Sequence, residues 1–130
     1  MTQFAKKGRF IVVANWKMNP VNRDEAKRIA GTIKNTAKDL KKTQVIIAAP
    51  YVYLPTLIGR AGKSAQSAVS FAAQNVNSEP QGSYTGEVSA EMLQDIDCSY
   101  IIVGHSERRA MGESDSVVAA KASAAIRAGL

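Results

Sequence analysis

The run from Arg9 to Lys17, RFIVVANWK, decides the fold of this chain, because an apolar β-branched segment leads directly into polar residues without a glycine. Residues Arg9 to Ala14 are nearly continuous in apolar character, which is typical of strands covered on both faces in a parallel sheet. Three further runs share this character: Gln44 to Ala49, Val69 to Ala73 and Tyr100 to Gly104. The sequence therefore predicts four strands.

Helical patterns follow each of the four runs. Residues Asn22 to Lys42 carry an apolar stripe on one side and charged residues on the other, and Asn22 with Glu25 resembles a capping box at the start. The stripe consists of Ala26, Ile29, Ala30, Ile33, Ala37 and Leu40. Further helices are expected over Leu54 to Ala61, from Ser89 through Leu93, and over Ser116 to Ala128, where Gly129 provides a helix end.

The resulting order, βαβαβαβα, fits right-handed crossovers between parallel strands. Two architectures have this order: a doubly wound open sheet and a piece of a (β/α)8 barrel. A dinucleotide-binding sheet would need G-x-G-x-x-G after the first strand, where Asn15 to Met18 stand instead, and no GxxxxGK[ST] motif occurs. Nucleotide-binding folds therefore lose most of their support.

Composition indicates an ordinary globular protein. Hydrophobic residues make up 45% and charged residues 22% of the 130 residues, and no apolar run reaches the ~18 residues of a membrane helix. The N-terminus does not resemble a secretory signal, so we expect a single soluble, cytoplasmic domain over residues 1–130 that binds no membrane. The lone Cys98 has no CxxC partner and no neighbouring His, and is expected to pack ahead of a strand, without a metal.

The formal net charge of +6 raises the question of an anionic partner. The basic residues are scattered along the termini and one helical pattern, without the interleaved aromatic residues of a nucleic-acid surface. We expect most of them on solvated helix faces and expect no nucleic-acid partner. A nucleic-acid-binding domain remains a third reading, which rests on the charge alone.

Polar residues at strand ends are the first candidates for a site, because ligands bind at the carboxyl ends of parallel strands. The period of two places Asn15 and Lys17 on the same face of the first strand as Ile11 and Val13. The same reasoning aligns Ile101, Val103 and His105 on the fourth strand. Lys17 and His105 would then form neighbouring rims of one pocket, able to hold and polarise an anionic carbonyl substrate.

Four stretches, in this order, resemble the motifs of the triosephosphate isomerase family. They are Ala14 to Asn19 (ANWKMN), Ala73 to Val76 (AQNV), Gly82 to Ser89 (GSYTGEVS) and Val103 to Arg109 (VGHSERR). The resemblance covers essentially the whole chain. It implies an α/β fold with parallel strands, namely the N-terminal (βα)4 half of a TIM (β/α)8 barrel, present as a single truncated domain.

The resemblance also implies roles for individual residues. Asn15 and Lys17 would bind the substrate, with Lys17 offsetting the charge of the phosphate and of the developing enediolate. His105 would be the electrophile that polarises the substrate carbonyl as a neutral imidazole. Glu107 would hold Lys17 in place, although capping the helix that starts at Ser106 is an equally good reading of its position. No cofactor and no metal are implied.

The turn-rich segment around Thr85, Gly86 and Glu87 resembles the loop through which the family forms homodimers. Pro80 and Gly82 support a protruding loop independently of the resemblance. The implied activity is the interconversion of glyceraldehyde 3-phosphate and dihydroxyacetone phosphate in glycolysis and gluconeogenesis. Its implied partner is therefore a small phosphorylated triose.

In the family, a glutamate after the sixth strand is the general base, and loops after strands six to eight hold the phosphate. A full barrel takes about 250 residues, so we expect the isolated chain to lack both and to be inactive. A half-barrel would also leave open edges and an uncovered interior lined by Ile11, Val13, Ile101 and Val103. The alternative function is accordingly a non-enzymatic half-barrel that self-associates.

Overall fold

A four-stranded parallel sheet is the centre of the fold. The computed structural model describes residues 10–59 and 69–130, and its strands pair in the order β1-β2-β3-β4. They are β1 (Phe10–Asn15), β2 (Thr43–Ala48), β3 (Val69–Ala73) and β4 (Tyr100–Ile101), each parallel to its neighbour. The predicted parallel sheet is confirmed, but β4 is shorter than the predicted Tyr100 to Gly104 because the chain turns away at Gly104, where φ is +64°.

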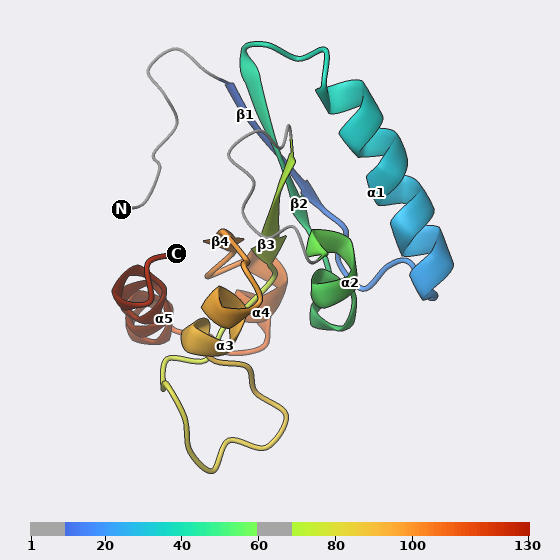
Figure 1. Ribbon diagram of the computed structural model, residues 1–130. Helices are drawn as coiled ribbons and strands as arrows, with labels where there is room; N and C mark the ends of the chain where they lie inside the picture. The colour runs from blue at the N-terminus through green and yellow to red at the C-terminus, as the bar shows by residue number, and fades with distance from the viewer. Residues whose placement is uncertain (1–9, 60–68) are drawn as a thin grey trace.

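Helices follow the strands as predicted (Figure 1). They are α1 (Arg23–Ala37), the 3-10 helix η1 (Tyr51–Tyr53), α2 (Leu54–Ile58), α3 (Ala90–Asp95), α4 (Ser106–Ala110) and α5 (Asp115–Arg127). The prediction that the first helix reaches Lys42 is wrong, since α1 ends at Ala37 to let the chain turn into β2, and Leu40 is left 43% exposed. Helix α2 ends before Gly59, and the predicted end at Ala61 lies outside the described residues.

Local capping explains where the helices begin and end. The Asn22 side chain accepts a hydrogen bond from the Glu25 amide at 2.9 Å, which confirms half of the predicted capping box. Ser89 and Ser114 cap α3 and α5 in the same way. Gly129 takes a φ of +82° after α5, as predicted for a residue that ends a helix.

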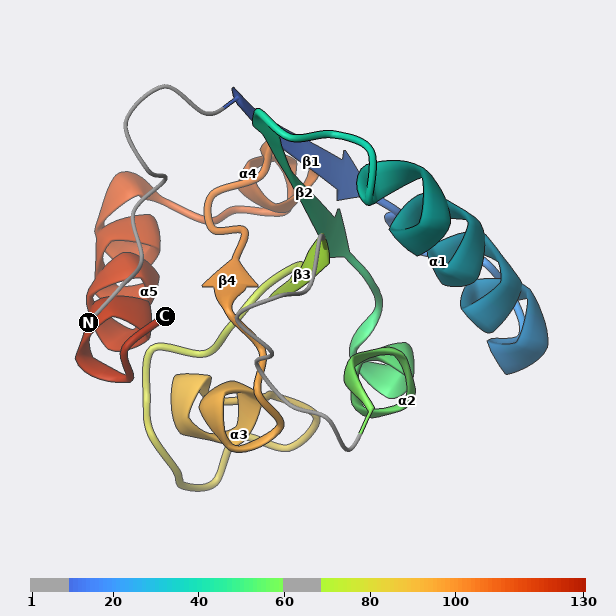
Figure 2. The ribbon, with the colours of Figure 1, turned by 45° about the horizontal axis from the view of Figure 1, so that its top comes forward.

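The main core lies between the strands and one layer of helices. Side chains from β2 and β3 pack against α1, α2, α3 and α5 in a single cluster that includes Ile47, Leu54 and Leu93. Figure 2 shows these helices arranged around the outside of a curved row of strands. The sheet and its helices form a half-barrel, and Cys98 is fully buried in this core as predicted.

The opposite face of the sheet, which is the barrel's inner face, carries a much smaller cluster. Ile46, Ala48 and Ala72 are buried there, with Tyr100 and Ile102 packed against them. The prediction that Ile101 and Val103 line this interior is wrong. Ile101 pairs with Ala73 and, like Val103, packs into the outer cluster beneath the helices, because the register of β3 with β4 puts Tyr100 and not Ile101 on the inner face.

Strand β1 is the exposed edge of the described sheet. Phe10, Ile11, Val12 and Val13 are 49–73% exposed, although β1 pairs with β2 along all six of its residues. Both faces of this apolar strand therefore lack cover, which confirms the predicted exposure of Ile11 and Val13. Within the described residues, no helix is long and apolar enough to cross a membrane.

Candidate active site

A salt bridge joins the end of the first strand to the start of the fourth helix. Lys17 Nζ donates a hydrogen bond to Glu107 Oε1 at 2.7 Å, across 90 residues of chain. The hydrogen bond from Lys17 holds the pKa of the Glu107 carboxyl below its usual range. The structure thus brings together the two residues expected to form this pair, although both side chains are more than half exposed.

Asn15 shapes the turn that carries Lys17. Its Oδ1 accepts a hydrogen bond from the Lys17 amide at 2.9 Å, and Lys17 has a φ of +55°, a left-handed conformation that costs a residue with a Cβ roughly 1–2 kcal/mol. Among the described residues, the Asn15 side chain makes no other hydrogen bond. Its Nδ2 group can therefore donate to a ligand. Backbone strain of this kind is often found where a side chain must be aimed at a ligand.

His105 is the N-cap residue of α4. Its Nδ1 accepts a hydrogen bond from the Glu107 amide at 3.2 Å and lies 3.6 Å from Glu107 Oε2. The hydrogen bond from the Glu107 amide uses the lone pair of Nδ1. In the neutral ring that accepts this bond, the proton is on Nε2. Glu107 is therefore next to both Lys17 and His105, and the predicted meeting of these residues at one rim is observed.

The side chain of His105 reaches the rim by a route that simple strand alternation does not describe. Val103 belongs to the outer cluster, and the chain then turns through Gly104 with a φ of +64° before His105. A Cβ at Gly104 would meet Val118 Cγ1 at 2.8 Å. Glycine is required here for both conformation and space.

Ion pairs hold α4, which is short and buries no residue of its own. Arg109 donates to the Gly104 carbonyl at 3.1 Å and to Asp115 at 2.6 Å. Arg108 donates to Glu113 at 2.5 Å. Since hydrophobic packing contributes little to α4, these contacts position the helix and hence its N-cap, His105.

A buried charge cluster, Glu113 with Lys121, Arg108 and Asn75, was missed by the sequence reasoning. Lys121 on α5 is 8% exposed and donates to Glu113 at 2.5 Å and to Asn75 at 2.8 Å. The signal that could have revealed it is spacing, because Lys121 shares its helix face with the buried Ala124 and Ala125. The cluster ties the end of β3 to α4 and α5.

The loop of residues 76–88, yellow in Figure 1, extends away from the sheet. Thr85, Gly86 and Glu87 are exposed in it, as predicted for a protruding surface loop. Its base is closed by the Asn77 amide, which donates to Val88 O at 2.8 Å, and by Asn77 Nδ2, which donates to Glu87 Oε2 at 3.2 Å.

The described residues include no group of three or more His, Cys, Asp or Glu side chains suited to a metal.

Comparisons with known proteins agree with this arrangement. A family model described as triosephosphate isomerase matches residues 10–130. The chain belongs to the triosephosphate isomerase family. Curated relatives of that name from Marinobacter nauticus and Symbiobacterium thermophilum are both 40% identical, over 94% and 92% of this chain and 47% and 46% of their own lengths.

A solved structure gives the same result for the fold. The triosephosphate isomerase of Bartonella henselae superposes with a TM-score of 0.80 at 33% identity, covering 94% of this chain and 49% of that protein. The chain spans about half the length of the relatives it matches. The described strands and helices thus correspond to the half-barrel that the family resemblance implied.

Gly104→Ala should destabilise the chain and disturb the rim. We expect a loss of roughly 1–2 kcal/mol in the free energy of unfolding from the left-handed φ, with a further cost from the contact with Val118. Urea unfolding measures the loss, and the His105 ring signals in NMR report its local effect. Gly31→Ala in α1 is the matched control and should stabilise by about 0.5–1 kcal/mol, since its Cβ meets nothing within 4 Å. Equal effects at the two glycines would contradict this account.

Glu113→Gln should destabilise the chain at neutral pH and do so less in acid. Removing the carboxylate leaves Lys121 buried without its counter-charge, which typically costs roughly 3–5 kcal/mol. Burial alone would raise the pKa of Glu113, but the hydrogen bonds and charges of Lys121 and Arg108 outweigh it and hold that pKa below its usual value.

The direction of the pH effect follows from this lowered pKa. Folding favours the Glu113 carboxylate, so its contribution is complete above the ordinary pKa of about 4.3 and is lost as the pH falls through the lower folded-state value. Urea unfolding from pH 7 to pH 3 should show the difference between wild type and Glu113→Gln closing in that window. The exposed Glu91→Gln is the control, and a difference independent of pH would refute the assignment.

Proposed function

We propose that this chain supplies the substrate-binding and electrophilic half of a triosephosphate isomerase site. The observation that carries the proposal is the salt bridge between Lys17 and Glu107 at 2.7 Å, with His105 beside the same carboxylate. Its substrates are glyceraldehyde 3-phosphate and dihydroxyacetone phosphate. The setting is glycolysis and gluconeogenesis in the cytoplasm.

The chemistry assigned to each residue follows from its contacts. Lys17 offers a cation to the phosphate and to the enediolate charge, and its exposure leaves that cation open to a ligand. Asn15 keeps Lys17 in its left-handed turn and adds the Nδ2 donors. In His105 the Nδ1 accepts the Glu107 amide, so Nε2 presents the proton that polarises the substrate carbonyl.

Catalysis needs a base that these residues do not provide. In the family that base is a glutamate after the sixth strand, and the 130 residues match only the first half of the relatives. A positioned base typically contributes about 10² to 10⁴ in rate, and the phosphate-binding loops and lid contribute more. We infer that these 130 residues alone have negligible isomerase activity and retain weak binding of a phosphorylated enediolate mimic.

Titration of such a mimic tests the proposed half-site. Binding should be weak and should fall about tenfold in Lys17→Ala, because a charged hydrogen bond to phosphate is worth about 1.5–3 kcal/mol. The exposed Lys27→Ala on α1 is the matched control and should bind like wild type. Equal binding by both variants would refute the half-site.

Turnover by the same chain distinguishes an inactive half-site from a competent one. The rate of triose phosphate isomerisation should be indistinguishable between the chain and its His105→Gln form. A sizeable rate that disappears in His105→Gln would show that the chain contains a working base and would overturn the proposed inactivity. The mimic titration is independent of this result.

Self-association is the second candidate function, and the exposed β1 favours it. Phe10 to Val13 present an apolar strand that is 49–73% exposed at the sheet edge, and such edges pair readily with another chain. We propose that two copies associate through this edge. A homodimer contact through Thr85, Gly86 and Glu87 is a separate proposal, supported by the exposure of that loop.

A charge placed on the edge strand tests the first contact. Val12→Lys should shift the chain toward monomer in sedimentation and light-scattering experiments, since inward or edge lysines block strand pairing. Val52→Lys is the matched control, because Val52 is 76% exposed and lies in η1. A monodisperse wild-type monomer, or equal effects of the two lysines, would contradict association through β1.

A further inference from the structure

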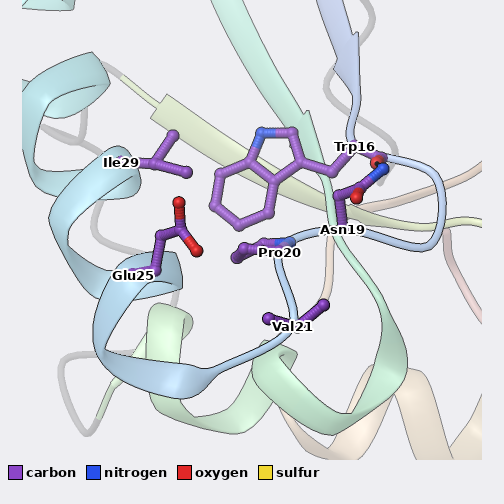
Figure 3. A pocket seen from close by; sticks show the side chains of 6 residues that line it. All are labelled: Trp16, Asn19, Pro20, Val21, Glu25 and Ile29. Carbon is purple, nitrogen blue, oxygen red and sulfur yellow. Dashed lines mark hydrogen bonds between the residues drawn. The ribbon is translucent and has the colours of Figure 1, made fainter.

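A small pocket lies between the segment after β1 and the first turns of α1, and none of Lys17, His105 and Glu107 lines it. Its volume is about 320 Å³, and Figure 3 shows the six side chains around it. The lining consists of Trp16, Asn19, Pro20, Val21, Glu25 and Ile29. Neither the salt bridge of Lys17 nor the proposed isomerase chemistry uses this space.

The walls of the pocket are held in place by hydrogen bonds. The Trp16 amide donates to Ala48 O at 2.9 Å, and the Tyr53 hydroxyl donates to Pro20 O at 2.9 Å. The indole itself is half-buried and packs against the main core. Sites fixed in this way lose little conformational freedom when a ligand enters.

The charge in the pocket belongs to Glu25. In Figure 3 its carboxylate and the indole of Trp16 face the same space. Its nearest charged neighbour among the described residues is Arg28, whose Nη2 lies 3.8 Å from Glu25 Oε1 and whose side chain is 71% exposed. The carboxylate makes no hydrogen bond within the described part of the chain, because the capping contact with Asn22 uses the backbone amide of Glu25.

An aromatic face beside a carboxylate with open acceptor sites selects a cation. Guanidinium fits best, since its plane stacks on an indole while its N–H groups form a fork with a carboxylate. Pro20, Val21 and Ile29 supply apolar contact for an alkyl stem. We propose that this pocket binds a guanidinium group carried on a short alkyl chain.

Trp16 gives a direct readout, because it is the single tryptophan of the sequence. Butylguanidinium, titrated at constant ionic strength, should change the fluorescence of Trp16 in a saturable way. Butylurea is a neutral probe of nearly the same shape and should bind at least about tenfold more weakly, as expected when a charge-assisted fork is lost.

The matched variants are Glu25→Gln and Glu91→Gln. Glutamine preserves the helix-start preference at position 25 but removes the charge, so butylguanidinium should bind about tenfold more weakly to that variant. Glu91 is exposed in the first turn of α3, and its replacement should leave binding unchanged. Three results would overturn the proposal: no saturable change, equal binding of butylurea, or unchanged binding by Glu25→Gln.

Discussion

The parallel pairing of β1 through β4 is the constraint on which the site depends. In a parallel sheet every strand ends at the same edge, and this sheet is also curved (Figure 2), so residues that follow β1 and β4 meet although 90 positions separate them. The Lys17 to Glu107 salt bridge is a product of this register. Both side chains are largely exposed, and exposed pairs contribute little to stability, so the pair follows from the fold instead of supporting it.

The parallel arrangement of the strands does not by itself direct the side chains of Lys17 and His105 to the rim. Two residues with left-handed backbone conformation, Lys17 and Gly104, set their directions. Lys17 at φ +55° is held by Asn15, while Gly104 at φ +64° redirects the chain from the outer cluster toward His105. Position 104 tolerates this conformation because glycine has no Cβ, whereas Lys17 needs the Asn15 side chain to compensate. Both turns therefore redirect the chain through a left-handed residue, one with a glycine and the other with a lysine held by a side-chain hydrogen bond.

These turns also explain what could be predicted from the sequence. Apolar continuity located all four strands, and the capping residue Asn22 located the start of α1, because both signals depend on near neighbours. Alternation failed at Ile101 and Val103, since the face of a strand is set by its register with the next strand and a glycine can reset it. The burial of Lys121 was not predicted because an alanine-rich helix gives a weak apolar stripe and because its partner Glu113 lies in a loop.

The buried charge cluster and the exposed strand indicate that the two edges of this half-barrel differ in local stability. Lys121, Glu113 and Arg108 tie α4 and α5 to β3 at one end of the sheet, so that end is ordered by charge as well as by packing. At the other end, β1 pairs with β2 among the described strands, and four of its large apolar side chains are 49–73% exposed. Local opening should therefore begin at β1, which bears Asn15 and leads into Lys17. Covering β1 would then order the rim that carries Lys17, because the same six residues form the edge of the sheet and lead into that rim.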